Sequence, residues 1–533
     1  MRARMVLTLP VALVVFAAAA VSAEAFPLTA TAPVEVSSTN PLAGCPPDGS
    51  GINFLGSEVE PWLEVNPTNP NNIVTFYQQD RYSNGGAKGN VAAVSFDGGL
   101  TWTRTVPEQR SRCTDDDQSF ERGTDPWISF GPDGTLHAMT LSVDPDPPTG
   151  GFGDNAMIYN RSTNGGVTWE QPITLRQDTD PNYLNDKNSM TADPNDPNFV
   201  YAVWDRAQDP SRAQHALENP IGLGFKGPIW FTRTTNGGDS WEPARKIYES
   251  GANKQTIGNQ IVVRPQGQLF DFFGDIVNNS RRRGGIGPVL VSFIVSADRG
   301  VTWSKPRSID DQLPMTLFRG SSTIDPEPVA CPVPSPTGAP CPIRSGDLIP
   351  EVDVNESNGN LYAVWMDSRF GPGGRPFEGI VFRDFFVYDS IAFSQSTNGG
   401  QTWSDTIKVN LTPETEPIGD RQAFTPSVDV GADGTVSVGY YDFRENTPDT
   451  ATLLTRHYAV HCHAASENCA NPASWNEETQ IGPAFNIREA PFARGYFLGD
   501  YVGLDHDPSS FVSGFGSTVG DGPSSIFASR LAP

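Results

Sequence analysis

The chain has 533 residues and a formal net charge of −25 at pH 7, because 62 acidic residues outnumber 37 basic ones. A chain this acidic repels nucleic acid and anionic membranes, so we expect no nucleic-acid partner. After the first 25 residues, no segment is long and apolar enough to cross a bilayer, so we expect no membrane insertion.

Residues 1–25 are typical of a secretory signal peptide. Two arginines precede an apolar stretch over residues 6–21, and a small-x-small cleavage site ends at Ala25. We therefore expect cleavage near Ala25, export from the cytoplasm, and a soluble, monomeric mature chain. Since no low-complexity linker divides the remainder, residues 26–533 are predicted to form a single domain.

Short strands and turns follow one another along the whole mature chain, which suits its 52 glycines and 47 prolines. The stretch Pro33–Ser37 is the first strand candidate. Six groups of predicted strands follow in chain order: Pro61–Val65, Ile73–Tyr77, Val91–Ser95 and Arg104–Val106; Pro126–Phe130, Leu136–Leu141 and Ala156–Tyr159; Phe199–Trp204 and Ile229–Thr232; Ile261–Val263, Leu269–Phe273 and Val289–Val295; Pro350–Val354, Leu361–Trp365 and Ile391–Ser394; Pro426–Val430, Val436–Tyr441 and Ala451–Tyr458. A partial seventh group comprises Tyr501–Leu504, Phe511–Phe515 and Ile526–Ala528.

One eight-residue motif, Ser/Thr-x-Asp/Asn-x-Gly-x-Thr/Ser-Trp, occurs five times. The copies span residues 95–102, 162–169, 234–241, 296–303 and 396–403. Its Asp or Asn can bond the backbone N–H groups of its own turn, its Gly tolerates strained backbone, and its Trp can pack beneath the turn. Because three copies carry Asn, the motif predicts a structural role and not acid–base chemistry.

This motif resembles the Asp box, or bacterial neuraminidase repeat, of sialidase-type β-propellers. The resemblance implies an all-β propeller in which four-stranded blades surround one axis. We predict seven blades, with the N-terminal strand completing the last one. Six blades are the alternative, in which the C-terminal segment only extends the sixth.

Acidic and basic residues recur where the second strands end and the first strands begin, and these places share one face of a propeller. The pairs are Asp80-Arg81, Asp205-Arg206, Asp367-Ser-Arg369 and Asp442-Phe-Arg444. Residues at the starts of first strands are Glu58, Glu60, Asp125, Asp347, Glu351 and Asp500. One interpretation is a cleft whose arginines bind a substrate carboxylate through paired N–H donors. The alternative is a set of repeated structural ion pairs between blades.

The resemblance implies a triad of arginines that binds a sialate carboxylate, a Tyr nucleophile supported by a Glu, and an Asp acid/base. The family's Arg-Ile-Pro segment is missing, because the corresponding stretch is Glu58-Val-Glu-Pro-Trp62. The catalytic candidates are Asp80, Asp125, Glu351 and Tyr501, and the substrate-binding candidates are Arg81, Arg206, Arg369, Arg444 and Arg494.

Three functions fit this pattern. The first is an exo-α-sialidase-like glycoside hydrolase acting on a terminal acidic sugar. The second is a non-catalytic propeller that binds glycan or protein, and the third is a polysaccharide lyase. The expected partner is a carbohydrate or glycoconjugate.

Six cysteines in an exported chain predict three disulfides, although six cysteines permit 15 connectivities. Cys331 with Cys341 and Cys462 with Cys469 are the local pairs, which leaves Cys45 for Cys113. We expect no cofactor and no metal. Structural Ca²⁺ at Asp115–Asp117 competes with a solvated acidic turn, and a metal at His461-Cys-His463 competes with a surface turn.

Overall fold

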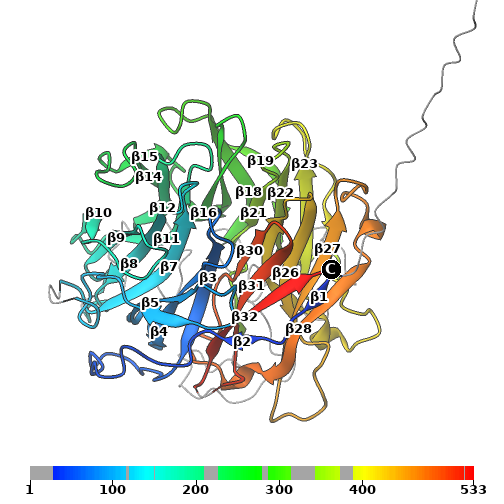
Figure 1. Cartoon of the computed structure of the whole chain (residues 1–533), viewed down its shortest axis with the longest axis horizontal. Helices are drawn as coiled ribbons and strands as arrows, with labels where there is room; N and C mark the ends of the chain where they lie inside the picture. The colour runs from blue at the N-terminus through cyan, green and yellow to red at the C-terminus, as the bar shows by residue number, and fades with distance from the viewer. Residues whose placement is uncertain are drawn as a thin grey trace, which may run out of the picture.

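The computed structural model describes residues 28–115, 119–148, 150–208, 226–278, 286–313, 343–371, 388–520 and 522–533. Over these ranges the chain is almost entirely antiparallel β-structure, as predicted (Figure 1). Its helical segments there are three short 3-10 turns, Ile418–Arg421, Pro472–Ser474 and Ile487–Glu489. None of the described helices has the length and apolar character needed to span a membrane.

The strands pair in successive antiparallel groups of four. The first two groups are β3 (Glu58–Val65), β4 (Ile73–Arg81), β5 (Ala87–Ser95) and β6 (Thr103–Thr105), then β7 (Arg122–Phe130), β8 (Leu136–Val143), β9 (Asn155–Ser162) and β10 (Ile173–Asp178). The next two are β11 (Tyr183–Ala192), β12 (Val200–Gln208), β14 (Ile229–Thr234) and β15 (Arg245–Tyr248), then β16 (Lys254–Val263), β17 (Leu269–Asn278), β18 (Ile286–Ser296) and β19 (Arg307–Gln312).

The later groups follow the same pattern. They are β21 (Glu351–Val354), β22 (Leu361–Asp367), β23 (Ser390–Ser396) and β24 (Ile407–Lys408), then β25 (Ala423–Val430), β26 (Thr435–Asp442), β27 (Leu454–His463) and β28 (Glu477–Asn486). The last comprises β30 (Gly503–Asp507), β31 (Ser510–Ser517) and β32 (Ser525–Ala532). Short strands β13 (Lys226–Gly227), β20 (Ile343–Arg344) and β29 (Tyr496–Phe497) lie between groups. β11 is a first strand that the sequence pattern did not predict.

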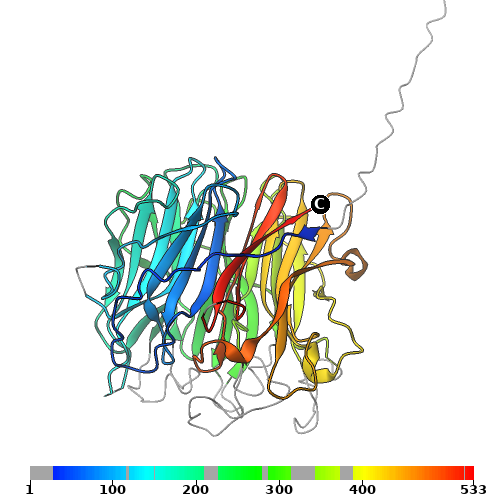
Figure 2. The same ribbon diagram turned by 60° about the horizontal axis from the view of Figure 1, so that its bottom comes forward.

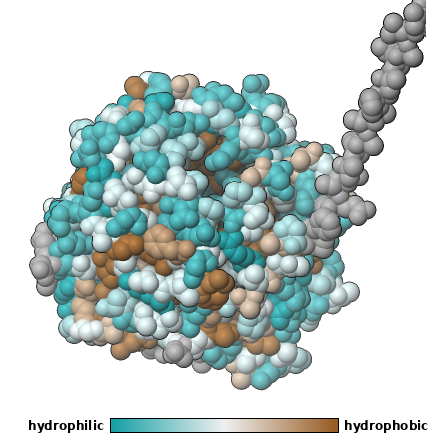
Figure 3. Space-filling model, in the orientation of Figure 1, coloured by the Kyte–Doolittle hydropathy of each residue, from teal (hydrophilic) through white to brown (hydrophobic). Residues whose placement is uncertain are grey.

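The first strands of the groups lie next to one another around the middle of the molecule. β3 contacts β7, β7 contacts β11, and the contacts continue through β16, β21, β25 and β30 back to β3. In Figure 1 the labelled first strands accordingly lie toward the centre, while β10, β15 and β19 lie toward the rim. Apolar clusters fill the space between groups: Phe76 of β4, for example, packs with Ile128 of β7 and Leu136 of β8. The surface in the same orientation is mostly hydrophilic, with scattered hydrophobic patches (Figure 3).

The N-terminal segment pairs with the end of the chain. β1 (Thr29–Ala30) and β2 (Val34–Glu35) both run antiparallel to β32, with Val34 opposite Ala528. The amide of Val36 donates to the Ile526 carbonyl at 2.7 Å, and the Val36 side chain is fully buried. Figure 2 shows the blue N-terminal strand lying beside red β32. The segment Pro33–Ser37 therefore pairs where the sequence analysis expected it.

The repeated motif forms tight turns stabilised by its Asp or Asn. Asp97 accepts bonds from the Thr101 amide at 2.9 Å and the Thr101 hydroxyl at 2.6 Å. Asn164 accepts from the Thr168 amide at 2.9 Å, but its Nδ2 donates to the Thr168 hydroxyl at 2.8 Å. A hydroxyl can donate or accept, so Asp and Asn serve equally well. This confirms that the motif is a structural element of each turn.

A bulge interrupts many of the first strands two to four residues after they begin. The residue in each bulge has a left-handed backbone, with φ of 54° at Glu60, 49° at Asp125, 48° at Lys187, 67° at Gly258 and 48° at Thr425. Among these five residues only Gly258 is a glycine, and a left-handed backbone is costly for the other residue types. Such bulges redirect side chains and are common next to functional sites. The repeated bulge is therefore the feature that positions the candidate site.

Two disulfides are present in the described ranges. Cys45 is bonded to Cys113 and Cys462 to Cys469, with Cα–Cα distances of 5.6 and 5.8 Å. These two predicted pairs are confirmed, while Cys331 and Cys341 lie outside the described residues. The disulfides fit a protein of an oxidising, extracytoplasmic compartment.

Candidate functional site

The bulges on β3, β7 and β11 bring charged side chains together at one end of the first strands. Lys187 Nζ lies 2.5 Å from Asp500 Oδ2 and 3.4 Å from Glu60 Oε1. The backbone amide of Lys187 donates to Asp125 Oδ2 at 3.1 Å, and Arg344 donates to Asp500 Oδ2 at 2.5 Å. Five chain segments thus contribute to one largely buried cluster, which we call the charged cluster: Glu60, Asp125, Lys187, Arg344 and Asp500.

The charges of this cluster set the protonation of its members. Burial raises the pKa of Glu60 to about 7, although Lys187 opposes the shift. Burial also disfavours an ionised Asp500, but the charges of Arg344 and Lys187 hold the pKa of that carboxyl well below its usual range. One carboxyl is therefore permanently ionised, while a neighbour titrates near neutral pH.

Three arginines approach one another beside this cluster. Arg81 lies 4.9 Å and Arg344 4.2 Å from the centre of the Phe497 ring. Burial and the charge of Arg344 lower the pKa of Arg81 to about 10, and the charge of Arg344 is the largest cause of a lowered pKa at the exposed Arg494. Because like charges are costly when close, this arginine trio, Arg81, Arg344 and Arg494, favours an anion.

Sequence reasoning included Arg81 and Arg494 but missed Arg344. Arg344 belongs to β20, which pairs in parallel with β29, so that Arg344 lies opposite Phe497. The residues that Arg344 contacts, Ala493 and Asp500, are 149 and 156 residues away in the sequence. No local sequence pattern identifies Arg344 as a site residue. Lys187 was missed because β11 was not recognised as a strand.

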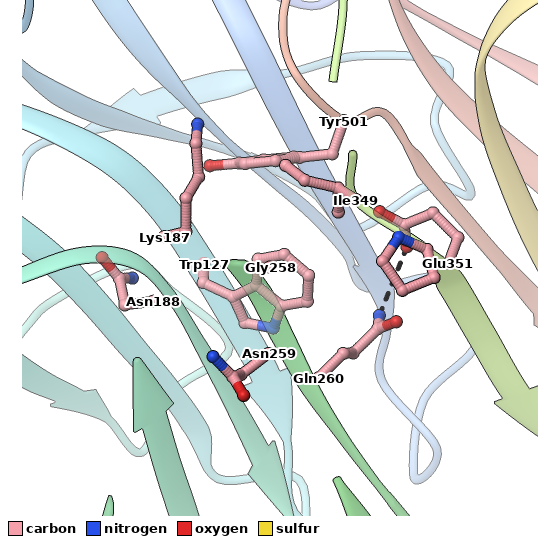
Figure 4. A pocket seen from close by; sticks show the side chains of 10 residues that line it. Trp127, Lys187, Asn188, Gly258, Asn259, Gln260, Ile349, Glu351 and Tyr501 are labelled. Atoms are coloured by element: carbon pink, nitrogen blue, oxygen red, sulfur yellow. Dashed lines mark hydrogen bonds between the residues drawn. The ribbon is translucent and has the colours of Figure 1, made fainter. Parts of the chain in front are cut away.

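A small pocket that is partly open to solvent adjoins the charged cluster between β11, β16 and the start of β21. It is lined by Trp127, Lys187, Asn188, Gly258, Asn259, Gln260, Ile349, Pro350, Glu351 and Tyr501 (Figure 4). Trp127 and Tyr501 supply aromatic surface, with ring centres 5.4 Å apart. Lys187 belongs to both the pocket and the charged cluster, so the two form one continuous site.

Two carboxamide oxygens of the pocket are buried without hydrogen-bond partners among the described residues. Asn188 donates through Nδ2 to the Asp125 carbonyl at 3.0 Å, and Asn259 donates to Asp205 Oδ1 at 2.6 Å. Their Oδ1 atoms remain unpartnered. A buried unpaired acceptor costs stability, so these oxygens are suited to bind ligand hydroxyl groups.

Glu351 and Tyr501 face this pocket with contrasting properties. Burial raises the pKa of Glu351 to about 8, and Gln260 donates to its Oε2 at 3.4 Å, the bond dashed in Figure 4. Glu351 is therefore protonated at neutral pH and can donate a proton. The Tyr501 hydroxyl donates to the Pro126 carbonyl at 3.0 Å, and burial raises its pKa well above the usual value.

The remaining predicted catalytic residue, Asp80, is engaged in structural contacts. Its Oδ2 lies 2.8 Å from Lys88 Nζ, and its Oδ1 accepts from Asn40 at 2.8 Å and from the Gly56 amide at 2.7 Å. Asp80 is fully buried. It does not pair with Arg81, although the two are adjacent in sequence, because Arg81 donates instead to Gln78 and Thr124.

The other predicted arginines each bind nearby carboxylates. Arg206 forms two bonds with Asp178, at 2.7 and 2.8 Å, and not with Asp205. Arg369 lies 2.8 Å from Asp367 and 2.5 Å from Asp310. Arg444 lies 2.6 Å from both Asp442 and Glu478. These contacts fit the structural interpretation of the Asp-Arg pairs, with Asp178 in place of Asp205.

The candidate calcium residues Asp115–Asp117 are only partly described, since residues 116 and 117 lie outside the described ranges.

No protein-family model and no curated protein matches the sequence. Among solved structures, a Dyadobacter fermentans protein of unknown function is 13% identical with a TM-score of 0.42, covering 90% of this chain and 97% of its own. A Hadza microbial sialidase is 12% identical with a TM-score of 0.42, and the match covers 86% of this chain and 73% of the sialidase. An α-L-arabinofuranosidase from Fusarium graminearum is 11% identical with a TM-score of 0.44, and the match covers 82% of this chain and 98% of the arabinofuranosidase. These likenesses are too distant to decide fold or substrate.

Proposed function

We propose that this chain is a secreted, single-domain, seven-bladed β-propeller that hydrolyses a terminal acidic sugar from glycans. Each four-stranded group is one blade, and β1 and β2 complete the blade of β30–β32. Support for closure comes from the cyclic contacts of the first strands, in which β30 lies against β3. Residues 1–25 act as the signal peptide.

The arginine trio is the observation that carries the proposed substrate class. A guanidinium donates two parallel hydrogen bonds to a carboxylate, and the charge of Arg344 contributes to the lowered pKa of both Arg81 and Arg494. The carboxylate of an acidic sugar would relieve this repulsion between like charges. Arg81, Arg344 and Arg494 then take the place of the family's triad, while Arg206, Arg369 and Arg444 stabilise the blades.

The adjoining pocket suits the sugar ring. Trp127 and Tyr501 offer aromatic surface to the apolar face of a pyranose, and the free oxygens of Asn188 and Asn259 can accept bonds from its hydroxyl groups. Small-ligand sites commonly combine apolar walls with a few placed polar groups. The pocket is small and partly open to solvent, so it would hold only part of one terminal sugar.

The pocket also holds groups suited to acid–base work. Glu351, protonated at neutral pH, would donate a proton to the leaving oxygen, while Tyr501 would attack the anomeric carbon. Glu60 would accept the tyrosine proton, since its charge is the largest electrostatic influence on the pKa of Tyr501. Asp125 would orient Lys187 by accepting a hydrogen bond from the backbone amide of Lys187.

One observation favours a second candidate, a propeller that binds glycans without catalysis. The Tyr501 hydroxyl is bonded to the Pro126 carbonyl, and its raised pKa makes a phenolate nucleophile difficult to form. Arginines and pocket would then recognise the same sugar without cleaving it.

The test is an activity panel with purified mature protein, in which fluorogenic α-sialosides and uronate polymers are compared. Release of the fluorophore from a sialoside, lost in Glu351→Gln and Tyr501→Phe, supports the hydrolase. Sialyllactose binding without turnover supports the binding protein instead. An unsaturated product from a uronate polymer would overturn both and identify a lyase.

A further inference from the structure

Two histidines and a glutamate gather at the end of β27, and none of them belongs to the proposed sugar site. His461 and His463 are two residues apart on the strand, so both side chains lie on the same face of the sheet. Cys462 lies on the opposite face, where its disulfide with Cys469 and its burial in a hydrophobic cluster hold the strand end in place. Glu477 on β28 is paired directly with His461.

The three side chains are close enough to share a ligand. One nitrogen of each imidazole ring and one carboxylate oxygen of Glu477 all lie within 4.8 Å of one another. His461 Nε2 lies 2.8 Å from Glu477 Oε2, and the two rings are 5.1 Å apart at 80°. Ligand atoms about 2 Å from one tetrahedral ion lie about 3.3 Å apart. The wider separations in this group would therefore have to shorten, while the 2.8 Å contact between His461 and Glu477 would have to lengthen.

The two rings also have hydrogen-bonding capacity that the fold leaves unused. His461 is 2% exposed, yet its Nδ1 has no hydrogen-bond partner among the described residues, and the same is true of His463 Nε2. His463 Nδ1 lies 3.0 Å from the Thr435 hydroxyl, which helps to set the ring orientation. Buried polar atoms are normally satisfied, so unpartnered nitrogens on adjacent rings call for an explanation.

We propose that His461, His463 and Glu477 bind a divalent transition-metal ion of the zinc class. Imidazole and carboxylate ligands suit Zn²⁺ and its neighbours in the transition series, whereas Ca²⁺ and Mg²⁺ prefer oxygen ligands. The Glu477 side chain is 31% exposed, which gives the ion a path from solvent and leaves a coordination position for water. The role is structural, because the site joins the ends of β27 and β28.

A second group, Asp429, Asp505 and His506, provides a comparison within the same chain. It also could hold a metal, but its carboxylates are engaged: Asp505 Oδ2 accepts from the Val65 amide at 2.6 Å, and His506 Nδ1 lies 2.9 Å from Asp429 Oδ2. A variant at His506 therefore serves as a matched histidine control.

The experiment titrates untagged, metal-free protein with Co²⁺, followed by visible absorption, and with Zn²⁺, followed by calorimetry. We expect one equivalent to bind, and His463→Ala and Glu477→Gln each to weaken affinity by at least about tenfold, while His506→Gln leaves it unchanged. Zn²⁺ should raise the Tm of the wild type but not of His463→Ala. Circular dichroism of the metal-free variants verifies that they are folded.

Two results would overturn the proposal. One is the absence of stoichiometric binding at micromolar metal. The other is binding that survives both His463→Ala and Glu477→Gln, or that is lost in His506→Gln, which would place the ion at the second group.

Discussion

Lys187 and Asp500 are 313 residues apart in the sequence, yet Lys187 Nζ lies 2.5 Å from Asp500 Oδ2. Both side chains are nearly buried, with exposed fractions of 10% and 5%. The pair joins β11 to the segment that precedes β30, across the middle of the molecule. Lys187 lies in a bulge of β11 and has a left-handed backbone, with φ of 48°.

Removing this lysine should destabilise the protein strongly. Lys187→Met leaves Asp500 with Arg344 alone and removes the charge that lowers the pKa of Glu60, so we expect the free energy of unfolding at pH 7 to fall by about 3 kcal/mol. Chemical denaturation measures the change. The control is Lys246→Met, since Lys246 pairs with Glu249 on the surface and should contribute less than about 1 kcal/mol. Equal effects of the two substitutions would contradict the role of the charged cluster.

The arginine trio predicts a contrast between two conservative substitutions. Arg344→Lys removes a planar pair of donors, so sialyllactose binding should weaken by about tenfold to a hundredfold, equivalent to about 1.5–3 kcal/mol. Arg369→Lys alters a guanidinium held by Asp310 and Asp367, so it should lower the Tm and leave the affinity of the folded protein unchanged. Calorimetry and thermal unfolding on both variants test this. If Arg369→Lys weakened sialyllactose binding and Arg344→Lys did not, the assignment of Arg344 to substrate binding and of Arg369 to stability would be reversed.

Glu351 predicts a specific dependence of stability on pH. Its pKa is raised from 4.5 to about 8 in the folded state, so the native protein retains a proton that the unfolded chain has lost between these values. The stabilisation is complete below pH 4.5 and is lost as pH rises through about 8. Glu351→Gln should therefore be more stable than the wild type at pH 8 by about 2–4 kcal/mol and show little difference at pH 4.

The same residue predicts the pH profile of any hydrolase activity. As a general acid, Glu351 must be protonated, so kcat should decline as pH rises above about 8. Measurements of kcat between about pH 5 and pH 10 test this prediction. A rate that stays constant to pH 10 would exclude Glu351 as the proton donor.

Closure by the N-terminal strands predicts that they stabilise the whole domain. A chain that begins at residue 38 lacks β1, β2 and the buried Val36, and β32 then has an open edge. We expect a single cooperative transition at clearly lower Tm, whereas a chain that begins at residue 28 should unfold like the mature protein. Calorimetry measures both, and an unchanged Tm in the shorter chain would contradict closure.

Local sequence determined the repeated architecture of this protein. The five turn motifs act through contacts within eight residues, such as Asp97 with Thr101, so their structure follows from their own side chains. The strand at Pro33–Ser37 and the pair Cys462–Cys469 were also predictable, because apolar pattern and short spacing are local features. The starts of first strands marked Asp125, Glu351 and Tyr501 as site candidates, and Glu351 and Tyr501 line the pocket.

Only the tertiary structure decided which charges meet. β11 escaped prediction because residues 185–189, Asn-Asp-Lys-Asn-Ser, lack the alternating apolar pattern of a strand: they form a bulge at the centre of the molecule. Arg344 reaches the site through a pairing with β29 that crosses about 150 residues. Arg206 binds Asp178 and not its neighbour Asp205, because successive side chains on a strand point to opposite faces. Neighbours in sequence such as Asp205 and Arg206 are thus kept apart, whereas the arrangement of the strands brings distant residues such as Arg344 and Asp500 together.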